Sequence, residues 1–184
     1  MKVLLTSCGL ETAAIENRFR EFLGDAARVK ALFIPVAAIN ADAIEVLPKC
    51  MKDLLKVGIL KENITVYDLH ESISQSELNK YGVVYLCGGD TKYLLKRMNE
   101  NGFSKQLLQY IDEEKGTVVG VSAGSLIFAD NLEGNLGLLK TTMKVHCSEE
   151  ICEPIGMTDI HRKETIYLGN TQALVIEKEK CCII

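Results

Sequence analysis

The amino-acid sequence predicts an α/β protein built on an open, mostly parallel sheet with helices on both faces. Two observations lead to this prediction. Apolar runs of strand length alternate with segments of helical periodicity five times in succession before residue 130. The strand runs are continuously apolar rather than alternating, which is typical of parallel strands that are buried on both faces of a sheet.

Five strands and five helices follow from this pattern. The apolar runs predict strands over residues 2–6, 29–36, 64–69, 82–87 and 117–121. Apolar side chains recur at intervals of three and four residues after each run. This spacing predicts helices over residues 11–23, 41–57, 74–80, 92–114 and 123–129. Ser74 is suited to cap the third of these helices, and Gly102 is a weak point inside the fourth.

The last third of the chain carries a less regular pattern. After Asp130, glycines and asparagines between residues 131 and 137 indicate a loop. Further strands are expected over residues 138–145, 165–168 and 172–176, either as an extension of the same sheet or as a small antiparallel flap. The length of 184 residues is within the usual size of one domain, so we expect a single α/β domain over residues 1–184.

Composition and charge argue against several classes of function. The sequence has 21 Lys and Arg against 25 Asp and Glu, so it lacks the basic excess with which proteins bind nucleic acids. Its apolar runs are shorter than the roughly 18–20 residues that span a bilayer, and its first residues do not resemble a signal peptide. Seven cysteines, an odd number, cannot all pair, which favours the reducing cytoplasm. A homodimer is compatible with these features.

A G-x-S-x-G pattern at residues 120–124 provides a candidate nucleophile. The pattern follows a predicted strand and opens a predicted helix, which is the context of the nucleophile elbow in hydrolases. Such a turn would expose the hydroxyl of Ser122, and the backbone N–H of Ala123 would point to the place where an oxyanion develops. The alternative is a glycine-rich turn between a strand and a helix, without chemistry.

Gly88 and Gly89 follow the fourth predicted strand and could supply a second oxyanion donor. Glycines let the backbone approach a ligand closely and present its N–H groups. An anion-binding turn for a phosphate or carboxylate is one alternative, and a tight turn in which Asp90 or Thr91 caps the next helix is another. The spacing of dinucleotide and Walker motifs is absent from this turn, which argues against nucleotides.

Three histidines are candidates for the base that activates the serine. His70 follows the third predicted strand and would lie at the correct edge of the sheet. His146 comes after Ser122, in the chain order that is typical of such hydrolases. His161 lies in a charged segment and is expected to face solvent. The residues alone leave His146 and His70 open.

Three segments together resemble peptidase family S51, which includes aspartyl dipeptidase and cyanophycinase. They are residues 33–38 (FIPVAA), 86–91 (LCGGDT) and 120–125 (GVSAGS). The resemblance implies a peptidase-like domain with an open α/β fold related to class I glutamine amidotransferases. Those amidotransferases carry a cysteine at the elbow, so the serine at position 122 argues against glutaminase chemistry.

The resemblance also implies roles for individual residues. Ser122 corresponds to the nucleophile and His146 to the general base. The N–H groups of Ala123 and Gly89 correspond to the oxyanion hole, with Gly88 as a further donor.

The third member of the catalytic group departs from the family's pattern. Read without gaps, the family position for the residue that orients the histidine falls on Asn170, and Asp130 is the alternative acid. An asparagine can orient an imidazole through its carbonyl oxygen but adds no charge, and loss of the acid can cost ~10⁴ in rate. The segment that would recognise an acidic N-terminal side chain is short here, which argues against aspartyl specificity.

These inferences predict a serine-type peptidase, an S51-like dipeptidase that hydrolyses short peptides through an acyl-enzyme. Neither a metal nor an organic cofactor is expected. Two alternatives stand beside this hypothesis. The chain is either a catalytically weak or inactive family member that binds a ligand or a partner, or a small esterase that uses the same elbow.

Overall fold

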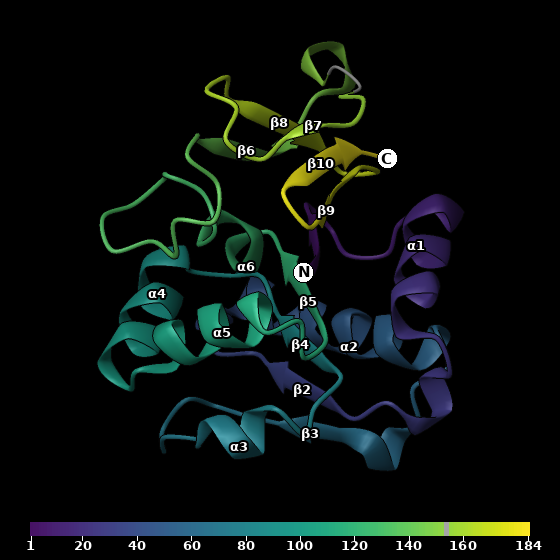
Figure 1. Cartoon of the computed structure of the whole chain (residues 1–184), viewed down its shortest axis with the longest axis vertical. Helices are drawn as coiled ribbons and strands as arrows, with labels where there is room; N and C mark the ends of the chain where they lie inside the picture. Colours follow the sequence, from purple (N-terminus) through teal and green to yellow (C-terminus); the bar gives the residue numbers. More distant parts are fainter. Residues whose placement is uncertain (153–154) are drawn as a thin grey trace.

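The computed structural model describes residues 1–152 and 155–184 and contains an eight-stranded sheet with helices on both faces (Figure 1). The strand order is β3-β2-β4-β5-β1-β9-β10-β7. The first five strands in this order are parallel, and the last three pair antiparallel. The predicted open, mostly parallel sheet is therefore confirmed. Its strands are β1 (Lys2–Thr6), β2 (Ala31–Ile34), β3 (Ile64–Val66), β4 (Val83–Leu86), β5 (Thr117–Val121), β7 (Thr158–Asp159), β9 (Ala173–Glu177) and β10 (Lys180–Ile183).

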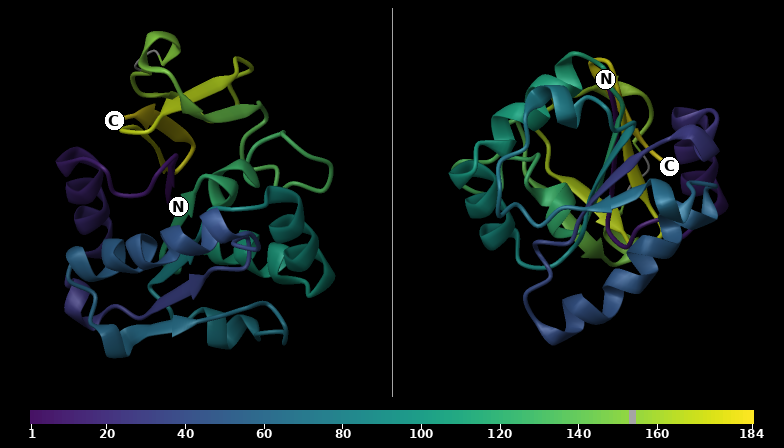
Figure 2. Two further views of the ribbon diagram at one scale, coloured as in Figure 1. Left: turned by 180° about the vertical axis from the view of Figure 1, so that it is seen from behind. Right: turned by 90° about the horizontal axis from the view of Figure 1, so that it is seen from below.

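Helices pack on both faces of this sheet (Figure 2). One face carries α1 (Ala13–Leu23) and α2 (Ala41–Lys56). Successive residues of a strand point to opposite faces. In β1, Leu4 therefore joins the core beneath α1 and α2, while Val3 and Leu5 join the core on the other face. That other face carries α3 (Gln75–Leu78), α4 (Thr91–Glu100), α5 (Phe103–Asp112) and α6 (Ala123–Leu126).

A small second sheet corrects the prediction of an antiparallel flap. β6 (Met143–Cys147) and β8 (Ile166–Gly169) form a separate two-stranded sheet, and they run parallel. The connection over residues 148–165 is long enough to return the chain to the starting end, whereas an antiparallel pair can be closed by a tight turn. The expected strand over residues 172–176 does extend the main sheet, as β9 beside β1.

The helix predicted over residues 92–114 is two helices, α4 and α5. Gly102 lies between them with a φ of 79°, a left-handed conformation that glycine adopts without steric cost. β3 and α6 are also shorter than predicted, because β3 ends at Val66 and α6 at Leu126.

The remaining helical segments are single turns. Ala26–Arg28 (η1), Lys61–Asn63 (η2) and Glu149–Ile151 (η3) form 3₁₀ helices in connecting loops. Within the part of the chain that the structure describes, every helix is too short or too polar to cross a bilayer.

Candidate active site

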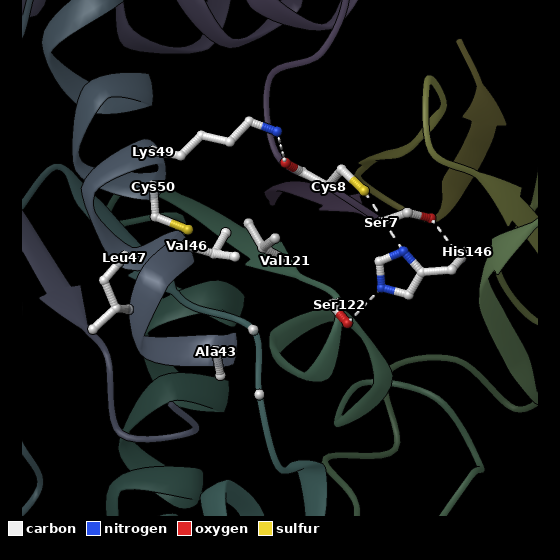
Figure 3. A pocket seen from close by; sticks show the side chains of 12 residues that line it. Ser7, Cys8, Ala43, Val46, Leu47, Lys49, Cys50, Val121, Ser122 and His146 are labelled. Atoms are coloured by element: carbon white, nitrogen blue, oxygen red, sulfur yellow. Dashed lines mark hydrogen bonds between the residues drawn. The ribbon is translucent and has the colours of Figure 1, made fainter. Parts of the chain in front are cut away.

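The carboxyl ends of β1, β4 and β5 meet at one edge of the main sheet, next to the β6–β8 sheet. This edge opens onto a pocket of about 310 Å³, whose opposite wall is one side of α2 (Figure 3). Four of the residues singled out in the sequence line this pocket, although they come from three different turns and strands: Gly88, Gly89, Ser122 and His146.

Ser122 lies on a sharp turn between β5 and α6. Its backbone has φ 49° and ψ −108°, a conformation that non-glycine residues rarely adopt and that is concentrated at functional sites. Two glycines allow this turn, because a Cβ at Gly120 would lie 2.4 Å from the carbonyl oxygen of Gly124, and one at Gly124 would lie 2.3 Å from that of Leu86. The sharp turn between strand and helix that the sequence suggested is therefore present.

His146 is brought to Ser122 by an irregularity in the small sheet. The pairing of β6 with β8 shifts between Lys144 and Cys147, so that one extra residue is inserted. His146 lies at this bulge with a φ of 57°, and bulges of this kind re-aim a side chain. Its Nε2 lies 2.9 Å from the Oγ of Ser122. Of the two histidines that the residues alone left open, His146 is the one that reaches the serine.

Asn170 follows β8 and contacts the other side of the imidazole. Its Oδ1 lies 2.9 Å from the Nδ1 of His146. A neutral imidazole whose Nε2 accepts a proton from Ser122 carries its own proton on Nδ1, and this N–H can donate to Asn170. The alternative third residue, Asp130, is not in this group, because its Oδ1 instead accepts a hydrogen bond of 3.2 Å from Asn135.

The other two histidines have different surroundings. His70 is exposed, and its Nδ1 lies 3.1 Å from a guanidinium nitrogen of Arg97. His161 is exposed as predicted, and its backbone N–H donates to Asp159 at 2.7 Å. His70 was expected at the same edge of the sheet as the serine, but its side chain does not line the pocket.

The Gly88–Gly89 turn faces the serine across the pocket. A Cβ on Gly88 would lie 3.2 Å from the Cβ of Ser122, so glycine permits this close approach. Gly89 has a φ of 138°, and a Cβ there would lie 2.0 Å from the carbonyl oxygen of Ala37. Neither its N–H nor that of Ala123 donates to any described residue. Both groups therefore have a hydrogen bond left to donate.

Asp90 adds the capping role that was an alternative for this turn. Its side chain accepts a hydrogen bond of 2.8 Å from the N–H of Tyr93 and so caps α4. The capping interaction and the free N–H of Gly89 coexist in one turn.

Ser7 connects β1 to the small sheet, a role that the sequence did not reveal. Its buried hydroxyl donates to the carbonyl oxygen of Leu168 at 3.0 Å and accepts from the backbone N–H of His146 at 3.2 Å. The position of Ser7 directly after the first predicted strand was the available signal. Cys8 lies beside it, with Sγ 3.2 Å from the Oδ1 of Asn170, and burial raises the pKa of this thiol. The neutral thiol can therefore donate to Asn170 without adding charge.

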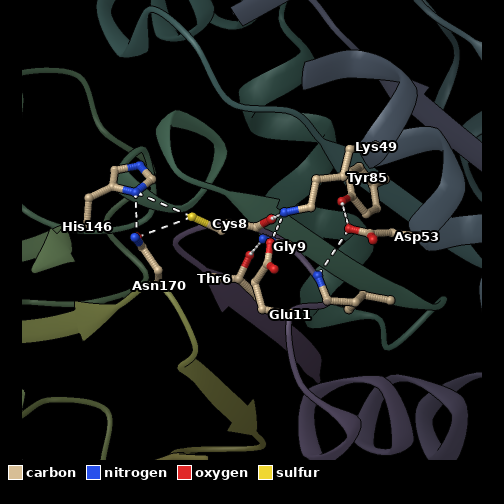
Figure 4. Close-up of polar contacts among 10 residues, drawn as sticks. Thr6, Cys8, Gly9, Glu11, Lys49, Asp53, Tyr85, His146 and Asn170 are labelled. Atoms are coloured by element: carbon tan, nitrogen blue, oxygen red, sulfur yellow. Dashed lines mark hydrogen bonds and ion pairs between the residues drawn. The ribbon is translucent and has the colours of Figure 1, made fainter. Parts of the chain in front are cut away.

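A buried carboxyl group holds the loop that follows Cys8 (Figure 4). Asp53, on α2, accepts hydrogen bonds from the N–H of Leu10 at 3.1 Å and from the hydroxyl of Tyr85 at 2.9 Å. Burial raises the pKa of Asp53, although both hydrogen bonds oppose the shift. Asp53 therefore fixes the loop after β1, and this contact keeps an ionisable group buried.

Replacing Asp53 by asparagine is expected to change how stability depends on pH. Because the pKa of Asp53 is raised by folding, its contribution to stability is complete below the unfolded pKa and is lost as the pH rises through the folded pKa. Asparagine keeps an acceptor for Leu10 and Tyr85 but does not ionise. The stability of Asp53→Asn relative to the wild type should therefore rise from about pH 4 to pH 7, as measured by urea unfolding. Asp112→Asn, at an exposed position, is the control, and a relative stability that is flat or falls with pH would contradict the expectation.

Comparisons with known proteins show what the chain is similar to. The model of peptidase family S51 matches residues 3–144. The matched segment contains both glycine turns and Ser122, and it ends just before His146.

Among the described residues, no group of three or more His, Cys, Asp or Glu side chains is placed to hold a metal ion.

Two curated relatives are similar to part of the chain. An uncharacterized peptidase of Listeria monocytogenes serovar 1/2a is 28% identical over 116 residues, which are 62% of this chain and 55% of the relative. An uncharacterized peptidase of Pasteurella multocida is 24% identical over 121 residues, which are 66% of this chain and 58% of the relative. The matched region therefore spans less than two thirds of the length of either relative.

Two crystal structures share the fold over the whole chain. One is that of a candidate peptidase E from Listeria monocytogenes EGD-e, with a TM-score of 0.76, 20% identity and coverage of 100% of this chain and 97% of that chain. The other is a peptidase from an acI-B1 Actinobacterium, with a TM-score of 0.65, 16% identity and coverage of 100% and 86%. These likenesses show the open α/β fold of the class I glutamine amidotransferase type.

Proposed function

Because the chain belongs to peptidase family S51, we propose that it is a serine-type peptidase that hydrolyses short peptides, with Ser122 as the nucleophile. One observation carries this proposal. The Oγ of Ser122 lies 2.9 Å from the Nε2 of His146, within the distance for proton transfer, and the Nδ1 of that imidazole lies 2.9 Å from Asn170. A nucleophile, a base and a residue that orients the base are thus in contact at one pocket.

In the first half of the proposed reaction, the Oγ of Ser122 attacks the carbonyl carbon of a peptide bond. The hydroxyl proton passes to the Nε2 of His146 as the new C–O bond forms. The carbonyl oxygen becomes an oxyanion, and the free N–H groups of Gly89 and Ala123 donate to it. When the C–N bond breaks, His146 gives its proton to the leaving amine, and an acyl-enzyme remains.

In the second half, water replaces the amine. His146 accepts a proton from the water, whose oxygen attacks the acyl carbon, and the same N–H groups stabilise the second oxyanion. The bond between the acyl carbon and Oγ breaks, the proton returns to Ser122, and a carboxylic acid is released.

Asn170 orients His146 in this reaction but supplies no negative charge. Its carbonyl oxygen selects the tautomer with the proton on Nδ1, which leaves Nε2 free to accept the proton of the serine. The imidazolium that forms during the attack is stabilised by a neutral acceptor, and hydrogen bonds to charged acceptors are roughly twice as strong. The proposed enzyme is therefore slower than one with a carboxylate at this position.

Labelling with a fluorophosphonate tests the proposal without knowledge of the substrate. The folded protein should form one covalent adduct, and peptide mass spectrometry should locate it at Ser122. Prior unfolding in urea should abolish the labelling, because activation requires the contact with His146. Folded protein that takes up no label at Ser122 would contradict the proposal and favour a family member that binds a ligand without catalysis.

A further inference from the structure

We propose that the pocket beside Ser122 receives a neutral, apolar side chain such as that of leucine, carried by the residue that contributes the scissile carbonyl group. This inference rests on the proposed serine peptidase function and assigns its substrate class. The position of the imidazole decides which side of the scissile bond the pocket serves. His146 protonates the leaving amine, so the leaving group lies on its side of Ser122. The acyl residue extends the other way, toward α2, and Figure 3 shows Ser122 between these two sides.

The wall that α2 presents to this space is apolar. Its pocket-lining residues recur at helical spacing, so they form one face of the helix. Val121, at the end of β5, closes the pocket next to the serine. The pocket of about 310 Å³ has room for an aliphatic side chain such as that of leucine. The residues of α2 that line the pocket are Ala43, Val46, Leu47 and Cys50, which are apolar, and Lys49, which is charged.

Charge at the pocket disfavours an acidic side chain. Among the described residues that line it, Lys49 carries the one permanent charge. Its ammonium group already donates to the carbonyl oxygen of Cys8 at 3.2 Å and forms an ion pair with Glu11 (Figure 4). An aspartate of a substrate would lose water against the apolar wall and find this cation already paired. A leucine side chain loses no hydrogen bonds on entering the same space.

The test compares two covalent probes, the N-acetylated diphenyl phosphonate analogues of leucine and aspartate. The Oγ of Ser122 attacks phosphorus, its proton passes through His146, and one phenol leaves, so the adduct forms without peptide turnover. Intact-mass spectrometry gives the second-order rate of modification for each probe. We expect the leucine analogue to react at least roughly 100-fold faster than the aspartate analogue.

A charged residue on the α2 wall should reverse part of this preference. Val46 is 46% exposed, so Val46→Lys introduces an ammonium group without disturbing the core. The ratio of the two rates should fall at least roughly tenfold, because the cation both disfavours leucine and pairs with aspartate. Val66→Lys, at a 60% exposed position of β3 outside the pocket, is the matched control and should keep the wild-type ratio.

The outcomes separate this inference from the proposed function. The apolar subsite alone would be overturned if the two analogues reacted at equal rates or if the aspartate analogue reacted faster. It would also be overturned if the leucine analogue did not react with protein that a fluorophosphonate labels at Ser122. An unchanged ratio in Val46→Lys would overturn its assignment to α2. If neither the analogues nor the fluorophosphonate modify Ser122 in folded protein, the serine peptidase function fails together with the inference.

Discussion

Replacing Ser122 by alanine should lower kcat by at least roughly 10³-fold and leave the free energy of unfolding nearly unchanged. Loss of the serine from a complete triad costs up to ~10⁶, and a neutral Asn170 makes the wild-type reaction slower, which reduces the difference. Among the described residues, the hydroxyl of Ser122 has one side-chain partner, His146, so stability depends little on it. Hydrolysis of the 7-amino-4-methylcoumarin amide of N-acetyl-leucine measures kcat, and urea unfolding measures stability.

Ser125 provides a control in which stability, rather than turnover, is expected to change. Its buried hydroxyl contacts the backbone of Thr6 and the carbonyl oxygen of Gly120 at 2.8–3.0 Å, so it joins β1 to β5 without reaching the pocket. Ser125→Ala should lose about 1–3 kcal/mol of stability and keep turnover at temperatures where it is folded. Turnover in Ser122→Ala that equals the wild type would show that another residue performs the hydrolysis.

Replacing His146 by glutamine should also lower kcat by at least roughly 10³-fold. The amide of glutamine can hydrogen-bond to Ser122, but it cannot accept the proton that the hydroxyl releases. The rate of fluorophosphonate labelling should fall in parallel, because the nucleophile is no longer activated. Stopped assays of amide hydrolysis and of labelling, on the same preparation, measure both effects.

His70 supplies the matched control, since its exposed imidazole lies next to Arg97 rather than in the pocket. His70→Gln should retain full turnover and full labelling. The opposite result, in which His70→Gln is inactive and His146→Gln is active, would mean that the imidazole 2.9 Å from Ser122 is not the base.

Local features made much of this molecule predictable from its sequence. Continuous apolar runs predict the central parallel strands β1, β2, β4 and β5, because both faces of these strands are buried, whereas the edge strand β3 is largely exposed. The position of Ser122 is predictable for a similar reason, since the strand, the turn and the helix N-terminus that expose it are consecutive in the chain. The division of the helix over residues 92–114 was visible in part, because Gly102 favours the left-handed conformation found there.

Features that depend on distant contacts were not predictable in this way. The parallel pairing of β6 with β8, and the bulge that aims His146, depend on residues that are far apart in sequence. The contacts of Ser7 join it to Leu168 and His146, more than 130 residues away. Chain order and a family resemblance favoured His146 over His70. The contact between His146 and Ser122 can be seen only in the structure.

The position of β1 between β5 and β9 has a consequence for the order in which a ribosome builds the site. A nascent chain that has emerged through α6 contains the elbow residues, but Asn170 and the partner of Ser7 at Leu168 are still untranslated. Domains fold as units while synthesis proceeds, so the imidazole gains its support only when the late strands dock. The proposed catalytic group is thus complete only after β8 and the residues that follow it have been synthesised.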